Sequence, residues 1–270
     1  MERPAWAPRG IDITVPSVSR IHDYYLGGSH NFEVDREAAR RATRFLPGLP
    51  KILRADRAFT RRAVRWAVGE GVTQFLDIGS GIPTFGNVHE TARAADPGAR
   101  VVLVDHDPVA VAHGRTVLAG DERAGTFTAD LRRPREILEH PVTAEVLDLT
   151  RPVAVLLVGV LHFVDDADAP YEAVAELTEA LAPGSLLILT HAALDAVPAD
   201  EEGVRGAAEV YRSVRAPLVG RSREGIARFL DGVELVDPGL VPLPRWRPEG
   251  PVEDEDPYAF SGFGGVGRAA

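Results

Sequence analysis

The stretch QFLDIGSGIPT, residues 74–84, is the part of the chain that decides the fold. An apolar run leads into Asp77 and is followed at once by Gly79-Ser80-Gly81 and the start of a helix. Two glycines at this spacing let the chain turn tightly and bring its backbone against a ligand. A dinucleotide fingerprint has a third glycine where this chain has Thr84, and an ordinary turn between a strand and a helix also uses glycine. The glycines alone do not distinguish a ligand-binding turn from an ordinary turn between a strand and a helix, so the neighbouring segments must be considered.

Short apolar runs alternate with helix-length amphipathic segments through the middle of the chain. We expect strands at 74–78, 100–104, 125–129, 153–158 and 185–190, and helices at 87–95, 108–119 and 169–181. This alternation predicts βαβ units and a parallel sheet that helices cover on both faces. A helix at 223–230 and two further strands, at 234–243 and 258–266, are expected to follow. These last two strands predict an antiparallel edge on the parallel sheet.

The first seventy residues follow a different pattern. Residues 1–15 are rich in proline and are expected to be irregular, whereas residues 16–70 are predicted to form a helical cap. Pro16 suits the start of a helix and Gly27-Gly28 its end. Further helices are expected at 34–45 and, from an apolar face at helical spacing, at 52–67. The predicted organisation is an irregular segment at 1–15, a cap at 16–70 and an α/β domain at 71–270.

Composition excludes several classes of protein. The 270 residues include no cysteine, which rules out disulfides, thiolate catalysis and zinc–thiolate sites, and no cluster of metal ligands stands out. The net charge of -10 argues against a protein that follows a nucleic-acid duplex. The chain begins without a signal-peptide pattern, and its longest apolar run, 153–164, is too short to span a bilayer. We expect a soluble, cytoplasmic protein that needs no metal and has no membrane partner.

Acidic residues end the second and third expected strands. Asp105 lies at the tip of the second, where a carboxylate can accept hydrogen bonds from both hydroxyls of a ribose, and Asp107, before Pro108, is the better helix cap. Asp130 follows the third strand and can accept from the exocyclic amine of adenine while the N–H of Leu131 pairs with a ring nitrogen. A helix cap is the other interpretation of Asp130. With the glycine turn, these residues predict an adenosine site without phosphates.

The order of the elements places other polar side chains beside this predicted site. His162 lies just past the fourth strand and is the best candidate for a general base, with a purely structural histidine as the alternative. His106 is expected near the adenosine. Asn31 and Tyr24 lie beside the Gly27-Gly28 turn, where they could close over a cofactor. Core packing is the alternative for Tyr24, and capping of the loop is the alternative for Asn31.

This combination of motifs resembles the class I S-adenosylmethionine-dependent methyltransferases, which have a Rossmann-like fold of seven strands. Three segments are similar to one branch of that family in high-GC bacteria, catalogued as a domain of unknown function. They are PSVSRIHDYYLGGSHNFEVDREAA (16–39), LLVGVLHFVDD (156–166) and PGLVPLPRWRP (238–248). The resemblance covers roughly residues 11–268. It implies the class I fold with an N-terminal helical cap and S-adenosylmethionine as cofactor, but no particular substrate.

The cofactor motifs of the family match this chain at definite positions. They fall on Asp77, Gly79, Ser80 and Gly81 for the glycine loop, on Asp105 for the ribose, and on Asp130 with Leu131 for adenine. The family often has a third glycine where this chain has Pro83. That departure stiffens the loop and leaves open how the methionine part of the cofactor is held.

Other functions compete with methyl transfer to a small molecule. A short-chain dehydrogenase needs a Tyr-x-x-x-Lys pair, and Lys51, the only lysine, has Pro47 four residues before it. Nucleic-acid methylation is disfavoured, because amino-methylating DNA enzymes carry Asn/Asp-Pro-Pro-aromatic where this chain has GVLH, 159–162. A regulatory protein that binds S-adenosylmethionine without catalysis stays open. The sequence thus predicts an S-adenosylmethionine-dependent methyltransferase acting on oxygen or nitrogen of a small molecule, and it does not predict the oligomeric state.

Overall fold

Parallel strands form the centre of the molecule, in the alternation expected from the sequence. They are β1 (Gln74–Ile78), β2 (Arg100–Asp105), β3 (Ala124–Thr128), β4 (Ala154–Leu157) and β5 (Leu186–Ala192). The computed structural model describes residues 7, 11–83, 86–193, 196–214, 216, 218–252 and 257–270, and within these the strand order is β3-β2-β1-β4-β5-β8-β6. The order reverses between β1 and β4, which pair in parallel. Open α/β sheets bind ligands at such a switch point, beyond the carboxyl ends of the strands.

The far edge of the sheet is antiparallel, as predicted. β8 (Gly262–Arg268) runs against β5, and both β6 (Glu234–Leu235) and β7 (Val241–Pro242) pair with β8. The single strand expected at 234–243 was wrong, because Pro238-Gly239 interrupts it and Gly239 adopts a left-handed φ of 82°. The strand expected from 258 begins only at Gly262, after the 3-10 helix η6 (Pro257–Phe260). The described residues therefore form eight strands, with the sixth of the seven expected strands split in two.

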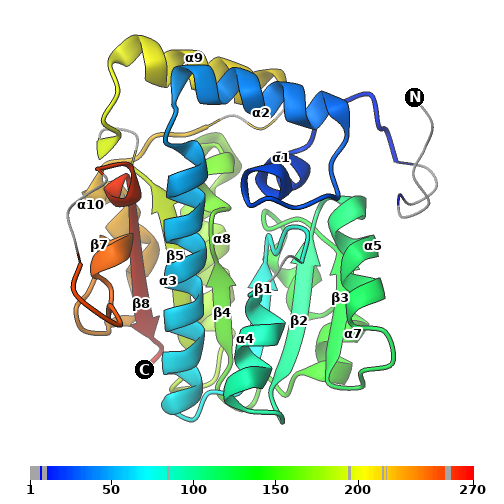
Figure 1. The fold of residues 1–270 in the computed structure, drawn as a ribbon. Coiled ribbons are helices and arrows are strands. Elements are labelled where there is room, and N and C mark those ends of the chain that lie inside the picture. The colour runs from blue at the N-terminus through cyan, green and yellow to red at the C-terminus, as the bar shows by residue number, and fades with distance from the viewer. Residues whose placement is uncertain are drawn as a thin grey trace.

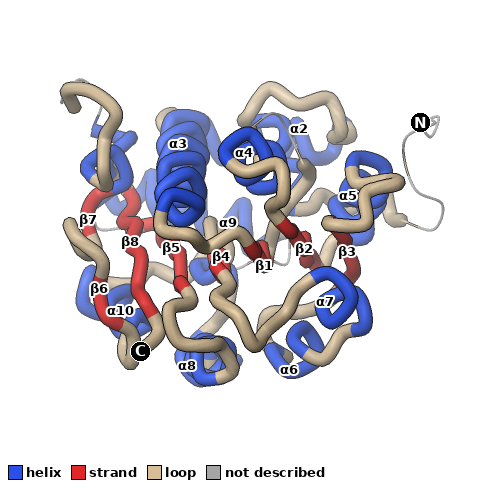
Figure 2. The backbone as a smooth tube through the Cα atoms, turned by 90° about the horizontal axis from the view of Figure 1, so that it is seen from below, coloured by secondary structure: helices blue, strands red, loops and turns tan. Residues whose placement is uncertain are grey.

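Helices cover both faces of the sheet (Figure 2). One face carries α3 (Leu49–Gly69), α4 (Val88–Ala95) and α5 (Pro108–Val117). The other carries α6 (Pro134–Leu138), α7 (Pro141–Val146), α8 (Pro170–Glu179) and α10 (Arg223–Ala227). Phe59, Ala63 and Val64 of α3 pack with strand residues such as Phe75 in one buried apolar cluster, and Val174 packs into a second cluster on the opposite face. This is the predicted Rossmann-like arrangement.

Three helices lie above the carboxyl ends of the strands. They are α1 (Val18–Tyr25), α2 (Glu33–Phe45) and α9 (Glu201–Ser213), and Figure 1 shows α2 and α9 running side by side with α1 between α2 and the sheet. Ala38 and Ala42 of α2 share a buried cluster with Ala207 and Tyr211 of α9. The sequence prediction missed α9, and it placed the cap entirely within residues 16–70. In the structure the cap gains a helix from beyond β5, whereas α3 packs on the sheet.

A buried ion pair ties α1 to α2. Arg20 donates from Nε to Oδ2 of Asp35 over 2.9 Å, and the two side chains are 3% and 0% exposed. Asp35 also accepts from the backbone amides of Ser17 (2.9 Å) and Phe32 (2.8 Å). The carboxylate therefore fixes the start of both helices. Among the described residues, no helix has both the length and the apolar character that crossing a membrane requires.

Candidate functional site

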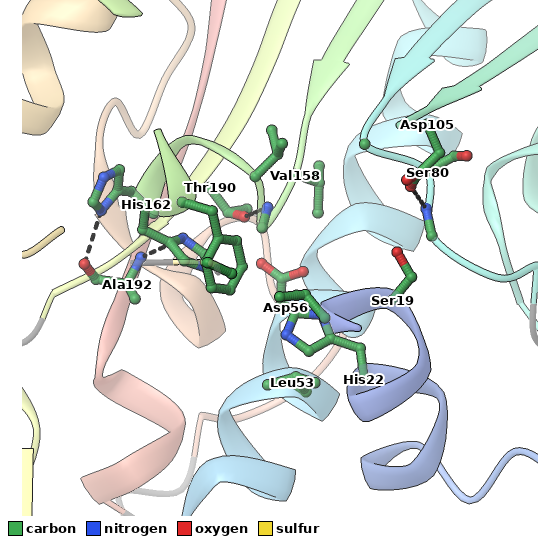
Figure 3. Close-up of a pocket in the computed structure, with 18 of the residues that line it drawn as sticks. Ser19, His22, Leu53, Asp56, Ser80, Asp105, Val158, His162, Thr190 and Ala192 are labelled. Carbon is green, nitrogen blue, oxygen red and sulfur yellow. Dashed lines mark hydrogen bonds between the residues drawn. The ribbon is translucent and has the colours of Figure 1, made fainter. Parts of the chain in front are cut away.

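A cavity of about 490 Å³ lies at the carboxyl ends of the central strands, beneath α1. Small-molecule sites typically enclose about 300–1,000 Å³, so this volume suits a ligand. Figure 3 shows Ser80 and Asp105 toward one end of the cavity and His162 toward the other. Asp56 of α3 and His22 of α1 lie between these two ends in the same view.

The turn after β1 presents backbone to this cavity. Gly79 and Gly81 have φ values of 79° and 65°, in the left-handed region that disfavours a side chain. A Cβ on Gly79 would lie 2.8 Å from the side chain of Val160, whereas a Cβ on Gly81 would meet no protein atom within 4 Å. The amides of Gly79 and Ser80 both bond the carbonyl of Val104, at 2.8 and 3.0 Å, which fixes the turn. The space beside Gly81 is therefore open to a ligand. Thr84, which takes the place of the third dinucleotide glycine, lies outside the described residues.

Asp105 stands beside that turn, at the tip of β2. Its Oδ2 accepts from the amide of Gly81 (2.7 Å) and its Oδ1 from the amide of Asp107 (2.8 Å). Burial raises the pKa of Asp105, which is 4% exposed yet lines the cavity. Each oxygen keeps a second lone pair for a ligand hydroxyl. Asp107 caps α5 through the amide of Val109, as predicted, and the exposed His106 lies at the cavity edge with Nδ1 3.4 Å from Asp105.

Asp130 and Leu131 line the cavity after β3. Asp130 pairs with Arg132 over 2.6 Å, and that hydrogen bond is the main reason why its pKa is lowered. The helix-cap interpretation of Asp130 was wrong, since α6 begins only at Pro134 with Arg133 at the cap position. The carboxylate is thus an ionised acceptor that a ligand amine would share with Arg132.

Charged groups meet at the floor of the cavity. Burial raises the pKa of Asp77 to about 7, against the opposing effect of Arg57. Burial also raises the pKa of Asp56 to about 6 and lowers that of Arg57. Asp77 and Arg57 carry opposite charges at neighbouring places in the cavity, which suits the ammonium and the carboxylate of a zwitterion.

Sequence reasoning missed Asp56 and Arg57. They belong to the row of α3 side chains that line the cavity, which is Leu49, Ile52, Leu53, Asp56, Arg57 and Thr60. The apolar face of the predicted helix included Ile52 of this row but not Leu49 or Leu53. Asp56 and Arg57 could have been found because they lie on the same helix face as these apolar residues. Ionisable side chains on a buried helix face need a partner or a function.

His162 lies at the other end of the cavity, in the 3-10 turn η1 (Leu161–Phe163). The buried Arg221 holds this turn by donating to the carbonyls of Leu161 (2.9 Å) and Val164 (2.8 Å). Arg221 also pairs with Asp166 over 2.6 Å. The turn that carries His162 is therefore rigidly attached to the rest of the fold.

The hydrogen bonds of two histidines fix their tautomers. Arg221 lies 2.9 Å from Nε2 of His191, and because a guanidinium only donates, Nε2 must accept. The Nδ1 of His191 then carries the proton and donates to the carbonyl of Ala192 at 2.8 Å. The amide of Ala192 in turn faces Nδ1 of His162 over a long 3.5 Å. Burial, followed by the proximity of His191, His22 and Arg221, keeps the pKa of His162 well below its usual value. His162 is thus a neutral imidazole, and the amide of Ala192 facing its Nδ1 favours the tautomer with the proton on Nε2.

The structure does not bring Asn31 and Tyr24 to the cavity. Asn31 is 5% exposed and donates from Nδ2 to Asp23 (2.8 Å) and to the carbonyl of Gly28 (3.0 Å), while Arg36 donates to its oxygen. Tyr24 packs against the apolar cluster shared by the cap helices. Asp23, which Asn31 holds, is itself a lining residue. Asn31 can therefore act on the cavity through Asp23, and no direct contact is made by either predicted residue.

The remaining predicted residues share the one cavity. Those that line it are Asp77, Gly79, Ser80, Gly81, Asp105, His106, Asp130, Leu131 and His162. The structure thus gathers residues from four strand ends that are far apart in the sequence.

Comparison with known proteins gives a consistent result. Residues 4–270 match the family described as S-adenosyl methyltransferase. A solved structure of a candidate methyltransferase from Thermobifida fusca YX is 39% identical, with a TM-score of 0.92 over 98% of this chain and 99% of that one. A protein of the domain-of-unknown-function family 574 from Streptomyces avermitilis MA-4680 is 35% identical, with a TM-score of 0.90 over 96% and 99% of the two chains. The search of curated proteins found no match.

Proposed function

Because the chain belongs to the S-adenosyl methyltransferase family and is an S-adenosylmethionine-dependent methyltransferase, we propose that it methylates an oxygen or nitrogen of a small molecule. The observation that carries the proposal is the cavity at the strand ends, which continues past the glycine turn into an apolar region under the cap. Leu53, Phe163, Tyr211 and Leu218 line that region. A net charge of -10 speaks against a nucleic-acid substrate. A cytoplasmic location is part of the same proposal, since a chain without cysteine suits a reducing compartment.

The residues at the other end fit S-adenosylmethionine. Gly81 leaves open space, and the Asp105 carboxylate has lone pairs to accept the ribose hydroxyls. Asp130 and the amide of Leu131 would hold adenine, and Asp77 with Arg57 would hold the ammonium and carboxylate of the amino-acid part. When bound, the cofactor supplies a methyl group made electrophilic by the sulfonium. The chain orients the two reactants and excludes water, which can supply much of the rate enhancement of such a transfer.

Labelled methyl transfer tests the proposed function. The purified protein is incubated with S-adenosylmethionine labelled in the methyl group and with three sets of acceptors: small hydroxyl and amine compounds, bulk RNA and DNA, and a mixture of proteins. We expect label on small molecules only. An Asp105→Ala variant is the control for background transfer. Label that appears only on a macromolecule would contradict the proposal.

The pKa of Asp77 leads to a prediction about cofactor binding. Asp77, with a pKa of about 7, is about half protonated in the free protein at pH 7. Pairing with the ligand ammonium favours the ionised form, so binding should release up to about half a proton at pH 7, more at pH 6 and little above pH 8. Calorimetry with S-adenosylhomocysteine in buffers of different ionisation enthalpy counts these protons. The difference between wild type and Asp77→Asn isolates the contribution of this residue, and equal proton counts in both would refute the assignment.

A further inference from the structure

Asp56 occupies the middle of the cavity and belongs to none of the cofactor motifs. Its Oδ2 is 3.7 Å from the position of a Cβ on Gly159, which places the carboxylate against the end of β4. Figure 3 shows it between the Asp105 end and the His162 end of the cavity. The residue is therefore positioned where the cofactor region meets the apolar region.

A hydrogen-bond chain orients this carboxylate. The hydroxyl of Thr190 on β5 accepts from the amide of Gly159 at 2.8 Å and shares a hydrogen bond with the side chain of Asp56. Since a hydroxyl has one proton to donate and Asp56 is an acceptor, that proton points to Asp56. The carbonyl of Asp56 accepts from Thr60 at 2.9 Å within α3. Thr190 thus orients the carboxylate of Asp56, which lines the cavity and retains further acceptor capacity.

The side chains near Asp56 indicate which kind of molecule receives the methyl group. Leu53, Val160, Phe163 and Leu218 line this side of the cavity and have no polar side-chain groups to solvate a charge. An uncharged aromatic compound loses little on entering such a site, whereas an ammonium loses its hydration.

His162 is poorly suited to take the proton of such an acceptor. Its Nδ1 faces the amide of Ala192, and its neutral form carries a proton on Nε2. It can therefore donate a hydrogen bond into the cavity, but it has no free lone pair there.

We propose, on the basis of the proposed function, that Asp56 is the general base and that the acceptor is the hydroxyl of a largely apolar phenol. In the transfer, the acceptor O–H bond breaks and its proton goes to the carboxylate of Asp56. The oxygen forms the new bond to the methyl carbon, and the carbon–sulfur bond breaks with its electron pair remaining on sulfur. The products are a methyl ether, S-adenosylhomocysteine and the protonated acid, which returns its proton to solvent.

The charges that face Asp56 agree with this role. The charges come from Arg57 on its own helix and Asp77 on β1. His22 on α1 adds none, because burial lowers its pKa to about 4. With a pKa of about 6, Asp56 is ionised near neutral pH and is still a stronger base than an ordinary aspartate.

The test compares Asp56→Asn with the exposed control Asp231→Asn, using phenol and 4-nitrophenol as acceptors. The asparagine keeps the shape and can accept from Thr190, so the variant should fold and bind S-adenosylhomocysteine within a few-fold of wild type. Its single-turnover rate with phenol should fall by about 10²–10⁴-fold, the usual contribution of a general base. The rate with 4-nitrophenol, a much stronger acid that is mostly ionised at about pH 8, should fall far less when both phenols are compared at that pH. Asp231→Asn should match wild type in all three measurements.

Several results would overturn the proposal. Equal losses with both phenols would show that Asp56 positions the acceptor without taking its proton, and a lost affinity for S-adenosylhomocysteine would make it a cofactor ligand. A His162→Gln variant that loses only the phenol reaction would assign the base to His162. Wild-type transfer to amines but to neither phenol would refute the acceptor class and leave the proposed function standing, whereas transfer to no small molecule would refute both.

Discussion

An Asp105→Ala variant is expected to bind S-adenosylhomocysteine about 10²–10⁴-fold more weakly than wild type. The carboxylate lies in the cavity beside the open space at Gly81, and each of its oxygens has a lone pair left after the internal bonds to Gly81 and Asp107. Hydrogen bonds to a charged acceptor contribute about 1.5–3 kcal/mol each, so losing two ribose hydroxyl bonds accounts for an effect of this size. Isothermal titration calorimetry measures it directly.

Two further variants separate binding from folding in this experiment. Asp105→Asn keeps one oxygen acceptor but removes the charge, and its affinity should fall between those of wild type and the alanine variant. Asp107→Ala removes a neighbouring buried carboxylate that caps α5, accepts from the hydroxyl of Ser17 and does not line the cavity. It should cost about 1 kcal/mol of stability with a smaller loss of affinity. Wild-type affinity in a folded Asp105→Ala protein would remove Asp105 from the cofactor site.

The central sheet could be predicted because its signals are local. Each strand is a short apolar run bounded by polar or turn residues, and β1 is buried along its whole length. Asp107 could be assigned as a cap because Pro108 follows it, and the structure confirms that assignment. Placing Asp105 at the cavity followed from the topology, since the carboxyl ends of neighbouring parallel strands meet at one edge of the sheet.

The cap could be predicted only in part, because its helices depend on contacts between distant segments. Residues 201–213 begin with Glu201-Glu202 and read as polar, and the helix they form packs against α2, more than 150 residues earlier in the chain. Asn31 was predicted to lie near a ligand because it follows Gly27-Gly28. The side chain of a residue after a turn can equally well point into the protein. Asp23 supplied the inward partner, at 2.8 Å. The contact of Asn31 leaves no trace in the sequence, whereas α9 does have an apolar face at helical spacing, formed by Val204, Ala207 and Val210, which the sequence analysis did not use.

Because the cap depends on contacts between separate segments, losing one buried contact should destabilise it. An Asp35→Ala variant is expected to destabilise the cap by about 3–5 kcal/mol, because it leaves the buried charge of Arg20 without its partner. It also removes the acceptor for the amides of Ser17 and Phe32. Since α1 contributes Val18, Ser19 and His22 to the cavity, opening of the cap should also weaken binding of S-adenosylhomocysteine.

Hydrogen exchange with and without S-adenosylhomocysteine measures this effect. In wild type the ligand should increase the protection of residues 17–32, and in Asp35→Ala those residues should exchange faster while β1, β2 and β4 keep their protection. Glu33→Ala is the matched control, because Glu33 lies in the same first turn of α2 but forms only partly exposed ion pairs with Arg36 and Arg40, which contribute little to stability. If Asp35→Ala lowered the melting temperature of the whole fold and left the affinity unchanged, the cap would be structural packing and would take no part in holding the ligand. If instead exchange at 17–32 and affinity changed together, the cap would be a lid whose closure contributes to binding, because a ligand can protect a segment only when it binds its closed form more tightly.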